Sequence, residues 1–431
     1  MAKKHILIAA VAASALLLAG CSSGGSGGSP SSAEPSGTIT FLTHRTDLVK
    51  DGTMAKYVAE FNKLHPQVTV SVEGYTDEKT VVTRLSTGDY GDALDIPSAV
   101  TSDQLSEFFA PYGNTSDLAS TYRFLASDSY KGIQYGLSGF GSASGIVYNK
   151  AVWKAAGVTS LPTTPDQFIA DLKLIKSNTT AIPYYTNYKD GWPLGKWQGL
   201  EGYTNNLNVR ADMVKNSAPW TQGTEQYTTD SLLYNVVHDG LSEPDPTTTS
   251  WEGSKTLLAT GQIATAVLGS WAIVQFQQAA TTAGADPTNI GFMPMPYQVD
   301  GKFHSSISGD VNVGVSLHSK NQNAAFAWAK WFVGQSSYAA DSGSLSSLVG
   351  APNPDTLKDF TDSGVQFVEV KPFPDPALES KIEAASSIDL FSNIYRQKLV
   401  DVARGAASGD MSSYFADLNK AWGAALTSVA G

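Results

Sequence analysis

An α/β fold with two lobes is predicted by the order of strand-like and helix-like segments and by the length of the chain. The segment Thr38–Thr43 (TITFLT) is rich in β-branched and aromatic residues, which is typical of a buried strand. A helical pattern and a second strand-like segment, Val68–Val72, follow it closely. A strand, a helix and a strand at this spacing predict a βαβ unit, and therefore a parallel sheet with helices packed on it.

The helix between these two strands is predicted by apolar residues at helical spacing. One face of this helix would carry Met54, Tyr57, Val58, Phe61 and Leu64. The pattern stops at His65-Pro66, because a proline disfavours helical backbone in the residue before it.

Strands and helices keep alternating further along the chain. Thr164 is predicted to cap a helix that has Pro165 at its first position. The C-terminal part is predicted to be mainly helical, most clearly from Ile388 to Val402. Other elements are expected, in chain order, at Val81–Leu85 (helix), Ala93–Ile96 (strand), Ile263–Leu268 (strand) and Ala324–Phe332 (helix).

The N-terminus has the features of a signal peptide. Two lysines precede an apolar run, Ile6–Ala19, that is shorter than the roughly 18 residues a membrane-spanning helix needs. The run closes with Leu18-Ala19-Gly20-Cys21, which resembles a bacterial lipobox. We therefore expect residues 1–20 to be removed and Cys21 to carry a lipid. The alternative is an ordinary secretory signal followed by an incidental cysteine.

A Ser/Gly/Pro-rich segment, residues 21–36, follows the signal peptide and is predicted to be a flexible tether, since it has almost no apolar side chains to bury. Removal of residues 1–20 leaves 411 of the 431 residues. This exceeds the roughly 250–300 residues that one hydrophobic core usually supports, which favours two lobes.

Composition and motifs exclude several classes of protein. With one cysteine, the chain forms no internal disulfide and no thiolate metal cluster. Without Lys3 and Lys4 the formal charge changes from −11 to −13, which argues against a nucleic-acid partner. The sequence contains no P-loop, no H-E-x-x-H and no dinucleotide-binding glycine motif after a strand. We therefore expect no catalytic residues, no cofactor and no metal site.

Three fragments resemble the extracellular solute-binding proteins of carbohydrate ABC importers, the group that includes maltose-binding proteins. They are Gly145–Lys150 (GIVYNK) with the Ala156-Gly157-Val158 that follows it, Gly261–Trp271 (GQIATAVLGSW), and Met293–Pro296 (MPMP) followed by Gly309-Asp310. The chain departs from the usual pattern at Pro165, Thr265 and Ser270, where the family commonly has Trp, Met and Pro.

This resemblance implies a type II periplasmic-binding-protein fold in which each lobe is a β-sheet flanked by helices. The chain would cross between lobes more than once, with an N-terminal lobe of residues 37–141 plus 292–335 and a C-terminal lobe of residues 142–291 plus 336–431. A sugar, expected to be an oligosaccharide, would bind in the cleft between them. The resemblance also implies a lipid-anchored monomer on the outer face of the cell membrane that delivers its ligand to the membrane subunits of an ABC permease.

Tryptophans are the first candidates for sugar contact, because the C–H faces of a pyranose pack on aromatic rings. Trp271 follows a predicted buried strand and matches the family's stacking Trp in a Gly-Pro-Trp turn. Trp192 and Trp197 lie in the loop-like segment DGWPLGKWQG. The alternatives are that Trp271 is a core residue and that the other two cover the lobe surface.

Polar candidates follow predicted strands, where α/β sheets place ligands. His44 and Arg45 come directly after the first strand; Asp95 ends another strand, and Ser98 follows it. Solvated loop charges and an aspartate that caps a turn are the alternatives.

Two further polar candidates lie near the expected crossings between lobes. Ser142 occupies a position where some relatives have a sugar-binding acid, so a contact there would be weaker or different. Asp310 follows Gly309, and its alternative is a turn aspartate.

Two other functions remain open from the sequence. A secreted glycoside hydrolase would need two carboxylates flanking a glycosidic bond, and the 40 acidic residues leave room for such a pair. A barrel with about eight βα repeats, usual for a hydrolase of this length, is not favoured by the helical C-terminal part. A receptor for a non-sugar solute such as a polyamine or glycerol phosphate is the other alternative.

Overall fold

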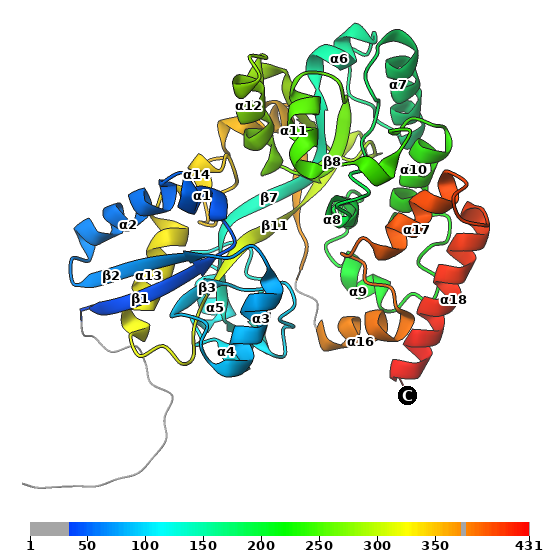
Figure 1. Ribbon diagram of the computed structural model, residues 1–431. Helices are drawn as coiled ribbons and strands as arrows, with labels where there is room; N and C mark the ends of the chain where they lie inside the picture. Colours follow the sequence, from blue (N-terminus) through cyan, green and yellow to red (C-terminus); the bar gives the residue numbers. More distant parts are fainter. Residues whose placement is uncertain (1–33, 372–375, 431) are drawn as a thin grey trace, which may run out of the picture. The chain divides into compact units, whose positions relative to one another are not determined.

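The computed structural model of the protein describes residues 34–371 and 376–430 (Figure 1). The predicted signal peptide, residues 1–20, and the predicted lipid-attachment residue Cys21 lie outside the described residues. None of the described helices is both long and apolar enough to span a membrane.

The predicted βαβ unit is confirmed. Strand β1 (Gly37–Thr43) pairs in parallel with β2 (Val68–Gly74) on one side and with β3 (Ala93–Asp95) on the other. Helix α2 (Thr53–Leu64) connects β1 to β2, and its buried residues include Tyr57. The carboxyl ends of β1 and β3 therefore lie side by side, which brings residues just after β1 close to the end of β3.

Two long antiparallel strands connect the two lobes. β7 (Gly136–Asn149) and β11 (Lys302–Val315) are 14 residues each, and the N-terminal part of β7 pairs with the C-terminal part of β11 (Figure 1). The N-terminal part of β7 and the C-terminal part of β11 continue the sheet of β1–β3. The C-terminal part of β7 pairs with β8 (Thr265–Gly269) and β9 (Ile290–Met293). One sheet, in the order β2-β1-β3-β11-β7-β8, thus runs through both lobes.

The hydrophobic cores show where the chain passes from one lobe to the other. Phe140 and Val311 pack in the core that contains β1 and α2, the N-terminal lobe. Ala143 and Ile307 pack in a core that contains β8 and β9, in the C-terminal lobe. Phe292 packs in the same core as Ile307.

The remaining elements cover the sheet and build the helical part of the C-terminal lobe. Those of the N-terminal part of the chain are α1 (Thr46–Lys50), α3 (Glu78–Thr87), α4 (Leu105–Phe108), β4 (Gly113–Asn114), α5 (Thr115–Leu118), β5 (Ser129–Tyr130) and β6 (Ile133–Gln134). Those between β7 and β11 are α6 (Lys150–Ala155), α7 (Pro165–Asn178), α8 (Trp192–Gly195), η1 (Gln198–Leu200), α9 (Val209–Met213), α10 (Glu225–His238), η2 (Pro246–Thr248), α11 (Trp251–Ala259), α12 (Ala272–Thr282), η3 (Pro287–Asn289) and β10 (Gln298–Val299). After β11 come α13 (Gln322–Gly334), α14 (Tyr338–Asp341), η4 (Asp355–Leu357), α15 (Lys358–Asp362), β12 (Gln366–Glu369), α16 (Pro376–Ser386), α17 (Ile394–Ala403) and α18 (Met411–Ala430).

Helix boundaries follow local capping chemistry. The Thr164 hydroxyl accepts a hydrogen bond from the Gln167 N–H, and Pro165 is the first residue of α7, so the predicted cap is confirmed. The helix predicted most clearly in the C-terminal part, from Ile388 to Val402, begins later than expected, because α17 begins at Ile394. The Asp389 carboxylate accepts the N–H groups of the two residues after Leu390 and holds this segment as a turn.

Candidate ligand-binding site

The ends of β1 and β3 form a polar cluster around Asp95. This carboxylate is buried, and its Oδ2 accepts hydrogen bonds from the Thr43 hydroxyl (2.7 Å) and the His44 N–H (3.1 Å). Nδ1 of His44 also lies 2.9 Å from Oδ2. Oδ1 has no hydrogen-bond partner among the described residues, although it too is buried. Buried acceptors are nearly always paired, so Asp95 has the capacity to accept one more donor.

His44 carries positive charge more readily than an ordinary histidine. Burial alone would lower the pKa of the imidazole, but the hydrogen bond to Asp95 and the negative charges of Asp95 and Asp310 outweigh it and raise the pKa. Its side chain is still 44% exposed. A half-exposed imidazole therefore lies beside a carboxylate that has a free acceptor oxygen.

Arg45 links the end of β1 to helix α14. Its Nη1 donates to the Tyr338 hydroxyl at 3.0 Å, and its Nε and Nη2 donate to both oxygens of Asp47. Tyr338 is buried, and burial raises the pKa of its hydroxyl. Arg45 is thus held by two partners within the protein, and Tyr338 joins the cluster from a position 293 residues away in the sequence.

Asp310 lies next to a strained residue of β11. Its Oδ1 accepts the N–H of Val311 at 2.8 Å, and Val311 has a φ of +52°. A β-branched residue in this region of backbone conformation is uncommon and costs about 1–3 kcal/mol. The strain lies at the point where β11 passes between the lobes, and Asp310 is close enough to His44 and Tyr338 to raise the pKa of each.

Three tryptophans from separate segments pack against one another. Trp192 begins α8, Trp251 begins α11, and Trp271 follows β8. The ring centroids are 5.1 Å apart for Trp192 and Trp251, 5.9 Å for Trp192 and Trp271, and 5.7 Å for Trp251 and Trp271. Trp271 is partly buried and packs against a core of each lobe, whereas Trp192 is 38% exposed. Two of the three were predicted as site residues, and Trp251 was not.

Trp197 does not belong to this group, which corrects the sequence-based interpretation. Its side chain is fully buried, and its Nε1–H donates to the Tyr184 hydroxyl at 2.8 Å. The ring is therefore a core residue, with its one polar group paired inside the lobe.

The two predicted serines play different parts. Ser142 is buried, and its hydroxyl lies 3.3 Å from that of Ser270, the residue before Trp271. Ser142 thus supports the turn that carries Trp271. The exposed Ser98 donates to Glu78 at 2.7 Å, beside the start of α3, and has no hydrogen bond to Asp95 or His44 among the described residues.

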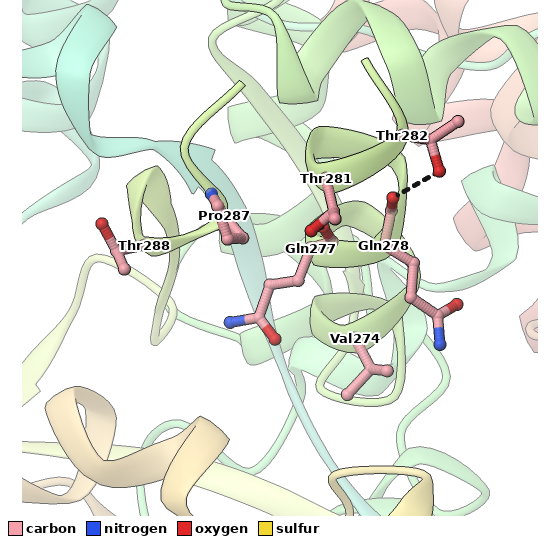
Figure 2. A pocket seen from close by; sticks show the side chains of 7 residues that line it. All are labelled: Val274, Gln277, Gln278, Thr281, Thr282, Pro287 and Thr288. Atoms are coloured by element: carbon pink, nitrogen blue, oxygen red, sulfur yellow. Dashed lines mark hydrogen bonds between the residues drawn. The ribbon is translucent and has the colours of Figure 1, made fainter. Parts of the chain in front are cut away.

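Surface hollows elsewhere contain none of the predicted site residues. One, of about 550 Å³, lies along α12 and η3 and is lined by uncharged residues (Figure 2). Another, of about 560 Å³, lies beside the ends of α7, α10 and α17. The described residues contain no group of three or more His, Cys, Asp or Glu side chains arranged to hold a metal ion.

Comparison with known proteins gives the family. The family model described as bacterial extracellular solute-binding protein matches residues 46–338, more than half of the chain. A multiple sugar-binding protein of Streptococcus mutans is 24% identical over 340 residues, which cover 76% of this chain and 78% of that protein.

Two solved structures from Bifidobacterium animalis subsp. lactis are similar over nearly their whole length. One is BlMnBP1, a binding protein of an ABC transporter, in complex with mannobiose; it is 32% identical with a TM-score of 0.84. The other is BlMnBP2, a manno-oligosaccharide-specific solute-binding protein in complex with mannotriose; it is 31% identical, also with a TM-score of 0.84. Each alignment covers 91% of this chain and 95% of the other. The family model spans β3, β7, β8 and β11 and all three tryptophans. The chain belongs to the bacterial extracellular solute-binding protein family.

Proposed function

We propose that this protein captures an oligosaccharide between its lobes and delivers it to an ABC importer. The observation that carries this proposal is that the protein has an aromatic surface and a polar surface near the crossing between the lobes. Trp271, Trp192 and Trp251 supply aromatic faces for the C–H faces of pyranose rings. Asp95 supplies an acceptor and His44 an imidazole N–H donor for sugar hydroxyls.

Manno-oligosaccharides are the sugars that we propose first. BlMnBP1 and BlMnBP2, which bind mannobiose and mannotriose, are 32% and 31% identical to this chain over nearly their full length. A neutral sugar also suits a site in which the Asp95 carboxylate already has the His44 imidazole as a partner.

We place the ligand between an N-terminal lobe of residues 37–141 plus 309–341 and a C-terminal lobe made of the rest of the folded chain. Asp95, His44, Arg45, Asp310 and Tyr338 would approach it from the first lobe. The tryptophans would approach it from the second. Because Trp271 packs against a core of each lobe, it would bring the two sets together when the lobes close on the ligand.

The same proposal includes anchoring and partners. A lipid on Cys21 and the tether of residues 21–36 would hold a monomeric receptor at the outer face of the cell membrane, within reach of a permease. A binding role needs no catalytic residue, so we assign none.

A thermal-shift screen tests this function. The chain without residues 1–20 is heated with mono-, di- and oligosaccharides of mannose and, for comparison, with other hexose oligosaccharides. A ligand at 100 times its dissociation constant adds about 2.7 kcal/mol to the free energy of unfolding, which gives a clear rise in melting temperature. Recovery of the sugar uncut supports a receptor, whereas shortened products would indicate a hydrolase. No rise with any sugar would exclude the proposed function.

A further inference from the structure

Two aromatic side chains are conspicuously exposed in the part of the chain that the structure describes. Trp192 is 38% exposed and Phe391 is 53% exposed, and the other exposed large hydrophobic residues are all aliphatic. The two are 199 positions apart in the sequence, yet both belong to the same small region of the C-terminal lobe. Exposed aromatic rings that gather in one place are typical of a binding surface.

The short helix α8 connects the two rings. Trp192 is its first residue, and Gly195, its last, lies directly against the backbone carbonyl of Phe391. A side chain at Gly195 would overlap this carbonyl, so only glycine permits the contact. At the start of the helix, Gly191 lies against the Asn393 side chain in the same way. The segment that carries Phe391 is thus packed along the whole of α8.

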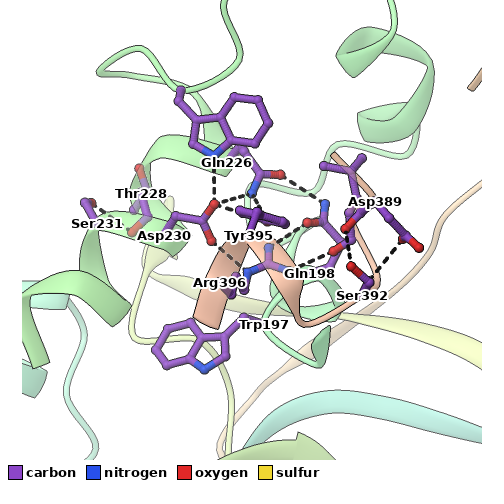
Figure 3. A network of polar contacts seen from close by, with 12 residues as sticks. Trp197, Gln198, Gln226, Thr228, Asp230, Ser231, Asp389, Ser392, Tyr395 and Arg396 are labelled. Carbon is purple, nitrogen blue, oxygen red and sulfur yellow. Dashed lines mark hydrogen bonds and ion pairs between the residues drawn. The ribbon is translucent and has the colours of Figure 1, made fainter. Parts of the chain in front are cut away.

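A buried ion pair beneath the surface holds α8 and the segment of Phe391 together. The Arg396 side chain is completely buried, and its Nε lies 2.9 Å from Oδ1 of Asp230 (Figure 3). Its Nη1 donates to the Leu390 carbonyl at 2.8 Å, and its Nη2 donates to the Gln198 amide oxygen at 2.7 Å. Leu390 immediately precedes Phe391, and Gln198 lies just after α8. One guanidinium therefore ties together the two segments that carry the exposed rings.

Burial of the Arg396–Asp230 ion pair costs free energy, and the positioning of the surface loop accounts for it. Removing two charges from water is unfavourable, and packed apolar residues often stabilise a core as well or better. Asp230 is fully satisfied by further donors, the Trp220 indole, the Gln226 amide and the Tyr395 hydroxyl. A rigid, fully paired network holds a surface loop in one position, which a purely apolar contact does less specifically.

The surroundings of Phe391 suit a sugar ring. The Arg210 guanidinium lies 5.5 Å from the centre of the Phe391 ring and is itself held by Glu379. The guanidinium lies over one side of the ring, and the ring is still 53% exposed, so the rest of it can pack on the C–H face of a pyranose while the guanidinium donates to hydroxyls. Trp192 lies at the other end of the four-residue helix α8, and its ring contacts both Trp251 and Trp271.

We propose that Phe391 and Trp192 form an outer subsite for a further pyranose ring of an oligosaccharide whose inner rings lie on Trp271 and Trp251. This subsite rests on the proposed sugar-binding function and extends it, since it makes the receptor selective for longer chains. Arg396 and Gln198 are positioning residues, which act by holding the two aromatic rings in place.

The test is calorimetric titration of the chain without residues 1–20 with mannobiose, mannotriose and mannotetraose. Phe391→Ala should leave the mannobiose dissociation constant within about twofold and weaken binding of the longer sugars by roughly three- to tenfold. Phe391→Tyr, which keeps an aromatic face, should bind all three sugars as the unmodified protein does. Leu64→Ala is the matched control, since Leu64 is 60% exposed on α2 of the other lobe.

Gln198→Ala tests the positioning role with the same three sugars. Loss of the Arg396 contact should weaken mannotetraose binding more than mannobiose binding, whereas a merely structural role would affect both alike. The melting temperature is measured in parallel. If Gln198→Ala fails to fold, the Phe391 variants still decide the subsite.

Several outcomes would overturn the subsite. An equal loss for all three sugars in Phe391→Ala would mean that this residue acts on the inner site or on the fold. If Phe391→Ala binds every sugar normally but cells that carry it take up sugar more slowly, the surface binds a protein partner and not a sugar. Unchanged binding and unchanged uptake would remove any role for Phe391. An unmodified protein that binds none of the three sugars would overturn the mannose-based function as well.

Discussion

Nδ1 of His44 lies 2.9 Å from Oδ2 of Asp95, while Oδ1 of the same carboxylate is buried and has no partner among the described residues. The pair joins the ends of two neighbouring parallel strands, where the sheet topology brings polar side chains together. An unpaired buried oxygen costs about 1–3 kcal/mol unless a ligand or a water molecule donates to it. This oxygen is therefore the strongest single indication of a ligand contact in the N-terminal lobe.

Asp95→Asn should weaken sugar binding by roughly ten- to a hundredfold, because hydrogen bonds to charged groups contribute about 1.5–3 kcal/mol. The fold of the N-terminal lobe should change little, since the amide oxygen of the substituted residue can still accept the hydrogen bond from the Thr43 hydroxyl. Calorimetric titration gives the affinity, and the melting temperature shows whether the protein remains folded. Asp103→Asn, on an exposed turn, is the matched control. Normal sugar binding by Asp95→Asn would remove this residue from the site.

Trp271→Ala should weaken sugar binding by tens-fold, because a large stacking contact contributes about 2 kcal/mol. The ring is only partly buried, so the variant should remain folded with a modest loss of melting temperature. Titration with the best ligand from the thermal-shift screen gives the affinity. A variant that binds normally, or that does not fold, would contradict a stacking role for Trp271.

Trp197→Phe should lower the stability of the protein and leave sugar binding nearly unchanged, unlike Trp271→Ala. The substitution removes the hydrogen bond from Nε1 to the Tyr184 hydroxyl and leaves a small cavity, which together should cost about 1–3 kcal/mol of the free energy of unfolding. Denaturant unfolding measures this loss. The affinity for sugar should stay within about twofold, and a large loss of affinity in a stable variant would instead return Trp197 to the site.

The stability of the protein should fall as the pH rises above the mildly acidic range. Burial, with a smaller contribution from the charge of Glu225, raises the pKa of Glu201 to about 8. Burial also raises the pKa of Asp128, Glu243 and Glu383 to about 7 each. In the folded protein these carboxyl groups stay neutral to higher pH than in the unfolded chain. The unfolded chain therefore releases protons first, and the free energy of unfolding decreases through this interval.

Melting temperatures measured between about pH 5 and about pH 8.5 check this dependence. The expected decrease is on the order of a few kcal/mol in the free energy of unfolding. Glu201→Gln should flatten the upper part of the curve, because Glu201 has the highest pKa of the four. A melting temperature that rises steadily from pH 5 to 8.5 would contradict the neutral state of these groups.

Much of the fold follows from local patterns in the sequence. The β1–α2–β2 unit and the start of α7 are confirmed because their signals, apolar periodicity and a Thr-Pro cap, act over a few residues. The start of α17 could not be predicted in this way. The Asp389 carboxylate stabilises a turn there by accepting two backbone N–H groups, although the apolar pattern continues through Ile388 and Leu390.

The site was harder to predict because its residues meet over long distances. Tyr338 reaches Arg45 from 293 residues away, and no pattern near Tyr338 indicates this contact. Trp251 was missed for the same reason, since it follows an ordinary helix cap, Ser250. Trp197 and Trp192 share one loop-like segment. Only the tertiary structure distinguishes them, because Trp197 packs in the core of the lobe and donates to the Tyr184 hydroxyl there.

Capture of an intact manno-oligosaccharide is tested most directly by calorimetric titration of the chain without residues 1–20 with mannotriose, followed by analysis of the recovered sugar. We predict saturable binding with one sugar per protein and recovery of mannotriose uncut. Absence of binding to mannotriose and to every other sugar in the screen, or recovery of mannose and mannobiose, would contradict a sugar-delivering receptor.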